Sequence, residues 1–137
     1  MPYRVEWLAE PRIVFVNVTH RLTLPEVAKA NGLMLGFLNQ AGAPLYVVVD
    51  VSELTDYPRI ASELQPILRS FYHPMLGGSY IYGVTTPAIN VILRILERVS
   101  PFNYKITKSF NEALTAIEAR EPALGPLIAA IDRNVWV

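Results

Sequence analysis

The 137-residue sequence contains no cysteine, and this absence excludes several kinds of chemistry at once. Disulfide bonds, zinc sites with thiolate ligands and thiol catalysis all require cysteine. The two histidines, His20 and His73, lie far apart in the sequence, and neither has a partner at the spacing of metal ligands. No G-x-S-x-G segment is present to form a nucleophile elbow. The sequence therefore predicts no metal site and no cofactor, and it contains no catalytic motif.

Charge is also scarce, because Asp, Glu, Lys and Arg make up only 18% of the residues. Twelve basic residues balance twelve acidic ones without a basic cluster, so binding of nucleic acid through phosphate contacts is not expected. No apolar run reaches the roughly 18 residues that span a bilayer, and the N-terminus does not resemble a signal peptide. We expect a cytoplasmic protein without a transmembrane segment, part of whose apolar surface is covered by another chain or a ligand.

The most informative stretch of the sequence is PLYVVVDVSELTDYP, residues 44–58. Residues 45–51 are apolar on both faces except for Asp50, which predicts a central strand of a mostly parallel sheet. Residues 52–57 are mostly polar and are expected to form the loop after that strand. In open α/β sheets, ligands and partners meet the chain beyond the carboxyl ends of the strands. This edge of the sheet is therefore where we expect the function.

The remaining pattern predicts a single α/β domain, with an N-terminal β-hairpin followed by βα repeats. These repeats would form a mostly parallel five-stranded sheet covered by helices. The expected elements, in order, are strands 3–8 and 12–18, helix 24–40, strand 45–51, a helical segment 58–72, a loop at Gly77-Gly78, strand 79–85, helix 88–99, strand 104–108 and a helix that begins after Ser109. Pro66 should kink the segment 58–72, or break it into two short helices, near Gln65. We assign residues 1–121 to the domain and residues 122–137 to a C-terminal helical extension, packed on the domain or on a partner.

The helix expected at 24–40 contains an unusual stripe of small residues, Ala28, Gly32 and Gly36, spaced four apart. Glycine in a helix interior costs about 1 kcal/mol relative to alanine, so another part of the structure should approach this backbone closely. The preferred explanation is tight packing against the protein's own sheet, and the alternative is contact with a helix of a second subunit. The wide apolar arcs of this helix and of helix 88–99 favour a homodimer.

The segments RIVFVNV, LTLPE and LYVVVDVSEL, in this order, resemble the SpoIIAA-like branch of the STAS fold, the STAS/SEC14-like domains. The resemblance covers residues 3–118 and implies the fold, a tendency to act by binding, and recognition at the same sheet edge. In anti-sigma-factor antagonists of this fold, the loop after the central strand carries an Asp-Ser-Ser-Gly-type motif, and phosphorylation of one serine controls binding to a kinase partner. Here Asp56 fits the acidic position, but Tyr57 and Pro58 replace the serines and Arg59 replaces the glycine. The phosphoserine switch is therefore not expected.

Polar residues follow the successive strands at the expected working edge. The candidate binding residues are His20, Ser52, Thr55, Asp56, Tyr57, Thr85 and Thr86. Helix N-termini at this edge favour a phosphate or carboxylate group. The preferred alternative is that the hydroxyls of Thr23, Thr86 and Ser109 simply cap their helices.

Two further groups allow more than one interpretation. Asp50 could act as a general base with a raised pKa, but an acid near a strand end more often accepts loop hydrogen bonds or pairs with a basic neighbour. Aromatic side chains could line an apolar pocket beneath the edge, although core packing is the preferred role for most of them. These aromatic residues are Tyr57, Phe71, Tyr72, Tyr80 and Tyr82.

The leading hypothesis is a non-enzymatic STAS-like interaction or regulatory domain that binds a protein partner or a small ligand at the carboxyl edge of its sheet. The alternative is a SEC14-like carrier of a small apolar or anionic ligand. An enzyme that uses Asp50 or Asp56 as a base ranks last.

Overall fold

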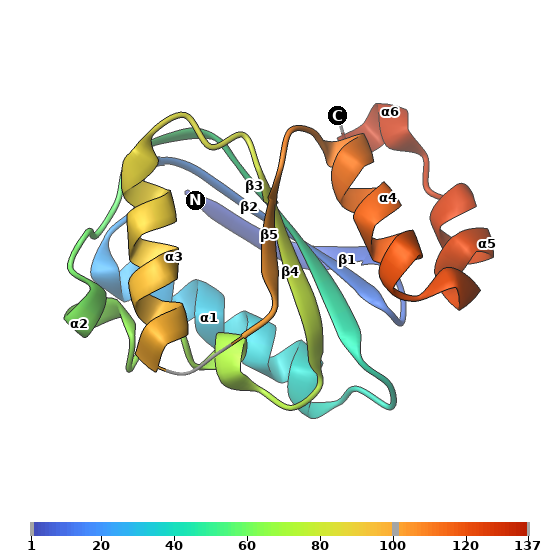
Figure 1. The fold of residues 1–137 in the computed structure, drawn as a ribbon, viewed down its shortest axis with the longest axis horizontal. Helices are drawn as coiled ribbons and strands as arrows, with labels where there is room; N and C mark the ends of the chain where they lie inside the picture. Colours follow the sequence, from blue (N-terminus) through green and yellow to red (C-terminus); the bar gives the residue numbers. More distant parts are fainter. Residues whose placement is uncertain (1, 100–101, 137) are drawn as a thin grey trace.

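The computed structural model, which describes residues 2–99 and 102–136, contains one five-stranded sheet in the order β1-β2-β3-β4-β5 (Figure 1). The strands are β1 (Tyr3–Ala9), β2 (Ile13–Arg21), β3 (Leu45–Asp56), β4 (Leu76–Tyr82) and β5 (Tyr104–Thr107). β1 and β2 pair antiparallel, whereas every other neighbouring pair is parallel. The predicted fold class is confirmed: an N-terminal hairpin followed by βα repeats in a mostly parallel sheet.

Helices cover both faces of this sheet, with α3 and α4 on opposite sides in Figure 1. The longer helices are α1 (Leu24–Asn39), α3 (Pro87–Val99) and α4 (Phe110–Arg120). The shorter ones are α2 (Ala61–Leu64), α5 (Gly125–Ala129), α6 (Arg133–Trp136) and the 3₁₀ turns η1 (Arg69–Tyr72) and η2 (Pro122–Leu124). The segment predicted at 58–72 is broken into α2 and η1, as Pro66 requires, because proline cannot donate the hydrogen bond that a continuous helix needs.

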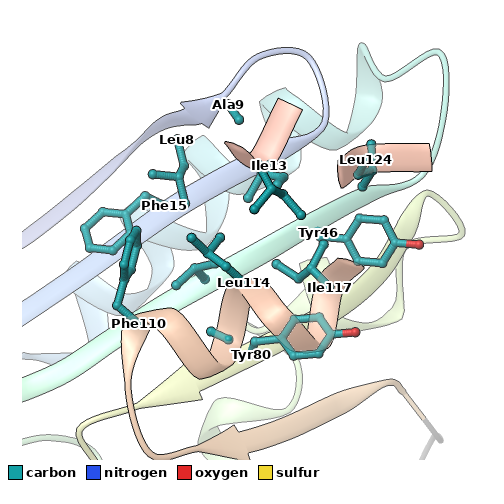
Figure 2. Close-up of a cluster of buried hydrophobic side chains, with 13 residues drawn as sticks. Leu8, Ala9, Ile13, Phe15, Tyr46, Tyr80, Phe110, Leu114, Ile117 and Leu124 are labelled. Atoms are coloured by element: carbon teal, nitrogen blue, oxygen red, sulfur yellow. The ribbon is translucent and has the colours of Figure 1, made fainter. Parts of the chain in front are cut away.

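The face toward α4 is filled by a buried cluster that includes Ile13, Phe15, Leu114 and Ile117 (Figure 2). Phe15 contacts Phe110 edge to face, with ring centres 6.2 Å apart. Aromatic pairs of this geometry add roughly 1 kcal/mol beyond their area burial. Because the hairpin strand β2 supplies Ile13 and Phe15, this cluster ties the N-terminal hairpin to the helix that follows β5.

The C-terminal residues after α4 pack on the same cluster. Leu124 and Ile128 are buried in it, and Trp136 contacts Phe15 with ring centres 5.0 Å apart. Arg133 donates a hydrogen bond of 2.6 Å from Nη1 to Oδ1 of Asn111. The division of the chain into a domain and an extension at residue 122 stays a prediction.

The prediction that β3 ends at Val51 is wrong, because the strand continues to Asp56. β2 is longer than expected as well, and its last residues pair with the added part of β3, Thr19 opposite Glu53 and Arg21 opposite Asp56. Irregularities in the register follow Asn17 and His20. The mostly polar residues 52–56 therefore belong to the sheet, where paired backbone groups hold them in place, and not to a loop.

The prediction for β4 is shifted by three residues. Gly77 and Gly78 lie within the strand and not in a loop, since Gly78 pairs with Tyr46 of β3. The strand ends at Tyr82 because Gly83 adopts a φ of +83°, a conformation that residues with a side chain rarely take. Thr85 consequently lies in the connection to α3.

The preferred explanation for the glycines of α1 is also wrong. A Cβ atom added at Gly32 or Gly36 would meet nothing within 4 Å, so this stripe does not pack against the sheet. Ala28, Gly32 and Gly36 are exposed, and the side chain of Leu33 beside them is 50% exposed. The helix instead buries Val27, Asn31, Met34 and Leu38.

Candidate functional site

The carboxyl ends of the four parallel strands meet at one edge of the sheet, which we call the carboxyl edge. It consists of the ends of β2 to β5 and the segments that follow them. The ends of β2 and β3 lie at the upper left of Figure 1. All seven candidate residues lie at or near this edge, because each belongs to the last part of a parallel strand or to the segment after it. They fall into two bonded groups and a set of separate residues.

The first group joins the segment after β3 to the segment after β4. The hydroxyl of Tyr57 lies 3.0 Å from Oγ1 of Thr86. The guanidinium of Arg59 lies over the Tyr57 ring, 4.9 Å from its centre. Asp56 Oδ1 accepts the backbone N–H of Tyr57 at 3.0 Å, and its Oδ2 lies 3.8 Å from Nε of Arg21. This group presents a carboxylate, two guanidinium groups and two hydroxyls on a polar surface.

The second group lies on the other face of the sheet, around Asp50. Asp50 Oδ1 accepts hydrogen bonds from the backbone N–H of Ser52 at 2.9 Å and from its hydroxyl at 2.6 Å. Tyr82 is the register partner of Asp50 on β4. Burial raises the pKa of the Tyr82 hydroxyl above its usual range, and the charge and hydrogen bond of Asp50 raise it further. Asp50 thus accepts hydrogen bonds from its own strand, and the hydroxyl of Ser52 is already engaged.

The remaining candidates stand apart. His20, Thr55 and Thr85 are exposed, and within the described residues no side-chain hydrogen bond or ion pair joins them to the other candidates. His20 adopts a φ of +54°, which is uncommon for a residue other than glycine, at the register irregularity near the end of β2. The carboxyl edge therefore brings together Asp56, Tyr57 and Thr86, whereas Ser52 is bonded to Asp50 and the other three candidates are separate polar side chains.

Two of the hydroxyls considered for an anion site cap helices. Thr23 Oγ1 accepts the backbone N–H of Glu26 at 3.4 Å, and Glu26 Oε1 accepts the backbone N–H of Thr23 at 2.9 Å, which completes a capping box. The hydrogen bonds that the Glu26 carboxylate accepts from the backbone N–H and from the hydroxyl of Thr23 lower the pKa of Glu26. Ser109 accepts the backbone N–H of Glu112 at 3.1 Å. Thr23 and Ser109 therefore have the capping role that the sequence favoured.

The five aromatic side chains do not form one pocket. Tyr80 and Tyr82 lie on the α4 face, where Tyr80 is buried and Tyr82 packs on the same cluster. Phe71 and Tyr57 line a cavity on the opposite face. Side chains of one strand alternate between faces, so aromatic residues from different strand positions need not converge.

Two adjoining cavities lie between the sheet and the helices on the α1 and α3 side. The first, about 150 Å³, lies beneath α1, and the second, about 170 Å³, lies between β3, β4 and α3. Five residues line both cavities: Leu22, Val27, Val49, Leu68 and Phe71. The second cavity reaches Leu54, Tyr57 and Pro58, so it extends to the segment after β3 at the carboxyl edge.

Sequence reasoning missed three residues that shape the edge. Arg21 and Arg59 supply its positive charge, although both are visible in the sequence beside predicted candidates. A Cβ atom added at Gly83 would lie 2.6 Å from Cβ and 2.7 Å from Cα of Ser52, so only glycine permits this close approach of β3 and the segment after β4. A glycine directly after a β-rich run was the available signal.

Residues 2–99 and 102–136 contain neither a cluster of metal ligands nor a helix able to span a membrane. No three His, Asp or Glu side chains in these ranges lie close enough together to hold a metal ion. No helix among the described residues combines the length and hydrophobicity that crossing a membrane requires.

The sequence matches no family model, and no curated protein matches it. Solved structures do match its fold. An uncharacterised DUF3478-family protein with a SpoIIAA-like fold from Shewanella loihica PV-4 is 16% identical, with a TM-score of 0.59 over 83% of this chain and 90% of that one. The unphosphorylated anti-sigma factor antagonist SpoIIAA is 10% identical, with a TM-score of 0.55 over 85% and 96%. The Bacillus cell fate determinant SpoIIAA in its phosphorylated form is 11% identical, with a TM-score of 0.59 over 84% and 98%. Together with the observed topology, these matches show that the chain has the SpoIIAA-like STAS fold.

Proposed function

We propose that this protein is a non-enzymatic interaction domain of the cytoplasm that recognises a protein partner at its carboxyl edge. The observation that carries the proposal is the bonded group of Asp56, Tyr57 and Thr86. It presents charged and aromatic side chains that the domain's own core does not use. Aromatic and arginine side chains are enriched at protein interfaces, and here the exposed Arg59 lies over the ring of the half-buried Tyr57. The resemblance in fold to SpoIIAA, an anti-sigma factor antagonist, supports the same reading.

Site-specific cross-linking in the native host tests this proposal. A photo-reactive amino acid placed at Thr55, which is exposed on the edge, should give a discrete adduct. The same group at Gln40, which is exposed at the end of α1 and precedes the amino end of β3, is the matched control and should give none. Equal labelling at both positions, or no adduct at Thr55, would contradict recognition at the carboxyl edge.

We also propose that the protein is a homodimer, and that α1 contributes to the interface. Its exposed stripe of Ala28, Gly32 and Gly36 allows a second helix to approach closely, and Leu33 beside it would be buried on association. Analytical ultracentrifugation should show a dimer that Leu33→Lys converts to a monomer. A strict monomer of the wild-type protein at high concentration would refute this part.

A second candidate function, a carrier of a small apolar ligand, is supported by the two adjoining cavities. Their walls are almost entirely apolar, and together they run from beneath α1 to the carboxyl edge. Apolar walls with a few placed polar groups are typical of small-molecule sites. Native mass spectrometry of freshly purified protein should then show a retained mass, and its absence under gentle conditions would count against tight binding.

A further inference from the structure

Two glycines at the start of β4 allow two tyrosine side chains to lie close to the backbone on the α4 face of the sheet. A Cβ atom added at Gly77 would lie 2.9 Å from the ring of Tyr46, and one added at Gly78 would lie 3.1 Å from the hydroxyl of Tyr80. Figure 2 shows both hydroxyls on the same side of the buried cluster, away from Phe15. The hydroxyl of Tyr80 therefore lies beside Gly78, at the end of the sheet where β4 and β5 begin.

A cleft of about 360 Å³ lies at this end, between the starts of β4 and β5 and the last turns of α4. Two cationic residues line it, Lys105 of β5 and Arg120 at the end of α4, together with Tyr80 and with Ala116 and Ala119 of α4. Sites for small molecules have volumes of about 300–1,000 Å³. The size of the cleft therefore favours a small ligand.

The positive charge of this cleft is not neutralised by the chain itself. Lys105 is the register partner of Tyr80, so both side chains project from the same face of the sheet. Burial raises the pKa of Tyr80, and the charge of Arg120 lowers it, so the guanidinium acts on the same hydroxyl. Among the described residues, no acidic side chain lines the cleft and no ion pair engages Lys105 or Arg120. Glu121, the next residue along the chain, is paired with Arg12.

Each cation has a structural role of its own, but neither role explains why the two meet. Arg120 lies in the last turn of α4, where a cation stabilises the carboxyl end of a helix. Lys105 lies on an edge strand, where lysine opposes pairing with another chain. Neither role requires both charges to line one cleft, where they repel each other. An anion bound between them would turn this repulsion into attraction.

The lining favours a phosphate monoester over other anions. Arginine binds phosphate through two parallel hydrogen bonds, and lysine binds it as a point charge. The hydroxyl of Tyr80 stays protonated at neutral pH, because burial raises its pKa, and can donate a further hydrogen bond. A phosphate monoester has three acceptor oxygens and about 1.5 to 2 negative charges at pH 7, whereas a carboxylate has two oxygens and one charge. The α4 side of the cleft is formed by the short apolar side chains of Ala116 and Ala119, which leave room for an organic group.

We propose that this cleft binds a small organic phosphate monoester, held by Lys105, Arg120 and the hydroxyl of Tyr80, with its organic part against Ala116 and Ala119. The cleft lies at the end of the strands opposite to the carboxyl edge. Binding here is therefore independent of the functions proposed for that edge and for the apolar cavities, and each can fail without the other.

The backbone amide NMR signals of three glycines test this proposal. Gly77 and Gly78 line the cleft, whereas Gly32 is exposed on α1 and is the internal control. The probes are phenyl phosphate, inorganic phosphate and the neutral benzyl alcohol, in a buffer without phosphate. We expect phenyl phosphate to shift the signals of Gly77 and Gly78 but not that of Gly32. It should bind several-fold more tightly than inorganic phosphate, because its ring is removed from water, and benzyl alcohol should not bind.

Charge variants identify the residues that hold the phosphate. Lys105 and Arg120 are exposed, so replacing them should leave the fold intact, as thermal melting confirms. Lys105→Gln and Arg120→Gln should each weaken binding of phenyl phosphate roughly tenfold, the value of one hydrogen bond to a charged group. Lys108→Gln is the matched control, because Lys108 is exposed just after β5 and does not line the cleft. It should change the affinity by less than about twofold, since salt screens exposed charges that are not in contact.

Four results would contradict this site. No shift of Gly77 and Gly78 up to the solubility limit of phenyl phosphate would show that the cleft does not bind it. Equal affinity for phenyl phosphate and inorganic phosphate would exclude a role of the organic part, and equal binding of benzyl alcohol would exclude a role of charge. A loss of affinity in Lys108→Gln as large as in Arg120→Gln would show only a general attraction of anions to the surface. None of these results would affect the cross-link expected at Thr55.

Discussion

The hydroxyls of Tyr57 and Thr86 lie 3.0 Å apart although the residues are 29 positions apart in the sequence. Their hydrogen bond connects the segment after β3 with the segment before α3, and Tyr57 also lines the second cavity. The polar surface of the carboxyl edge and the apolar cavity therefore meet at one side chain.

A double-mutant cycle measures this connection. Tyr57→Phe and Thr86→Val each remove one hydroxyl and keep the shape of the side chain. We expect each to lower the free energy of unfolding by about 0.5–1 kcal/mol and the double variant to lose less than the sum, because the two residues share one hydrogen bond. Urea unfolding gives all four values. Strictly additive losses would show that the two hydroxyls are not coupled.

Replacing Gly83 should be far more costly than replacing an unconstrained glycine. Gly83→Ala places a Cβ atom 2.6 Å from Ser52 and forces alanine into a φ of +83°. We expect a loss of roughly 2–4 kcal/mol in the free energy of unfolding, from strain and overpacking together. Gly42→Ala is the matched control, since its Cβ would meet nothing within 4 Å, and it should change stability by less than about 1 kcal/mol. Similar values for both variants would mean that β3 and the segment after β4 do not approach as described.

The raised pKa of Tyr82 predicts that the stability of the folded protein decreases at alkaline pH. Its pKa is raised in the folded state by burial and by Asp50, whereas in the unfolded chain tyrosine titrates near pH 10. Above about pH 10 the unfolded chain therefore binds fewer protons than the folded one, and stability falls as pH rises. Tyr82→Phe should make this fall less steep, as measured by urea unfolding at a series of alkaline pH values. An unchanged slope in Tyr82→Phe would show that the Tyr82 hydroxyl titrates as in the unfolded chain.

The ion pair of Arg12 and Glu121 should contribute more than a surface pair. Arg12 Nη2 lies 2.5 Å from Glu121 Oε2, both side chains are largely covered, and Arg12 also donates to the carbonyl of Pro44 at 2.9 Å. Glu121→Gln leaves a partly buried guanidinium without its counter-charge, and we expect a loss of about 1–3 kcal/mol. The exposed pair of Arg4 and Glu6 provides the comparison, and Glu6→Gln should cost less than about 1 kcal/mol. Equal costs would show that Arg12 and Glu121 are as solvated as the surface pair.

The fold was predictable from the sequence because hydrophobic periodicity, helix caps and proline positions all agreed. The apolar residues 45–48 are buried in the central strand, and Thr23 with Glu26 forms the predicted capping box. The length of β3 was not predictable, because its last five residues are held by pairing with β2 and not by burial of their side chains. Local polarity indicated a loop where a tertiary contact maintains a strand.

The candidate site was predictable only as a location. Parallel strands must end at one edge, so the grouping of Asp56, Tyr57 and Thr86 followed from topology. The sequence could not predict which face of α1 is buried, because the four-residue spacing of Gly32 and Gly36 is the same whether they face the sheet or the solvent. The pairing of Asn31 with Ser70, 39 positions away, likewise depends on how η1 packs on α1, which no local pattern encodes.

The most direct test of the account is the yield of the Thr55 cross-link when the charge of the carboxyl edge is reversed. Asp56→Lys replaces the carboxylate that faces Arg21, whereas Glu118→Lys makes the same change in charge at an exposed position of α4. If the carboxyl edge is the recognition surface, Asp56→Lys reduces the Thr55 adduct several-fold and Glu118→Lys leaves it unchanged. An adduct of twice the chain's mass would identify the partner as a second copy. An adduct that is equally abundant in both variants would contradict the assignment of function to this edge.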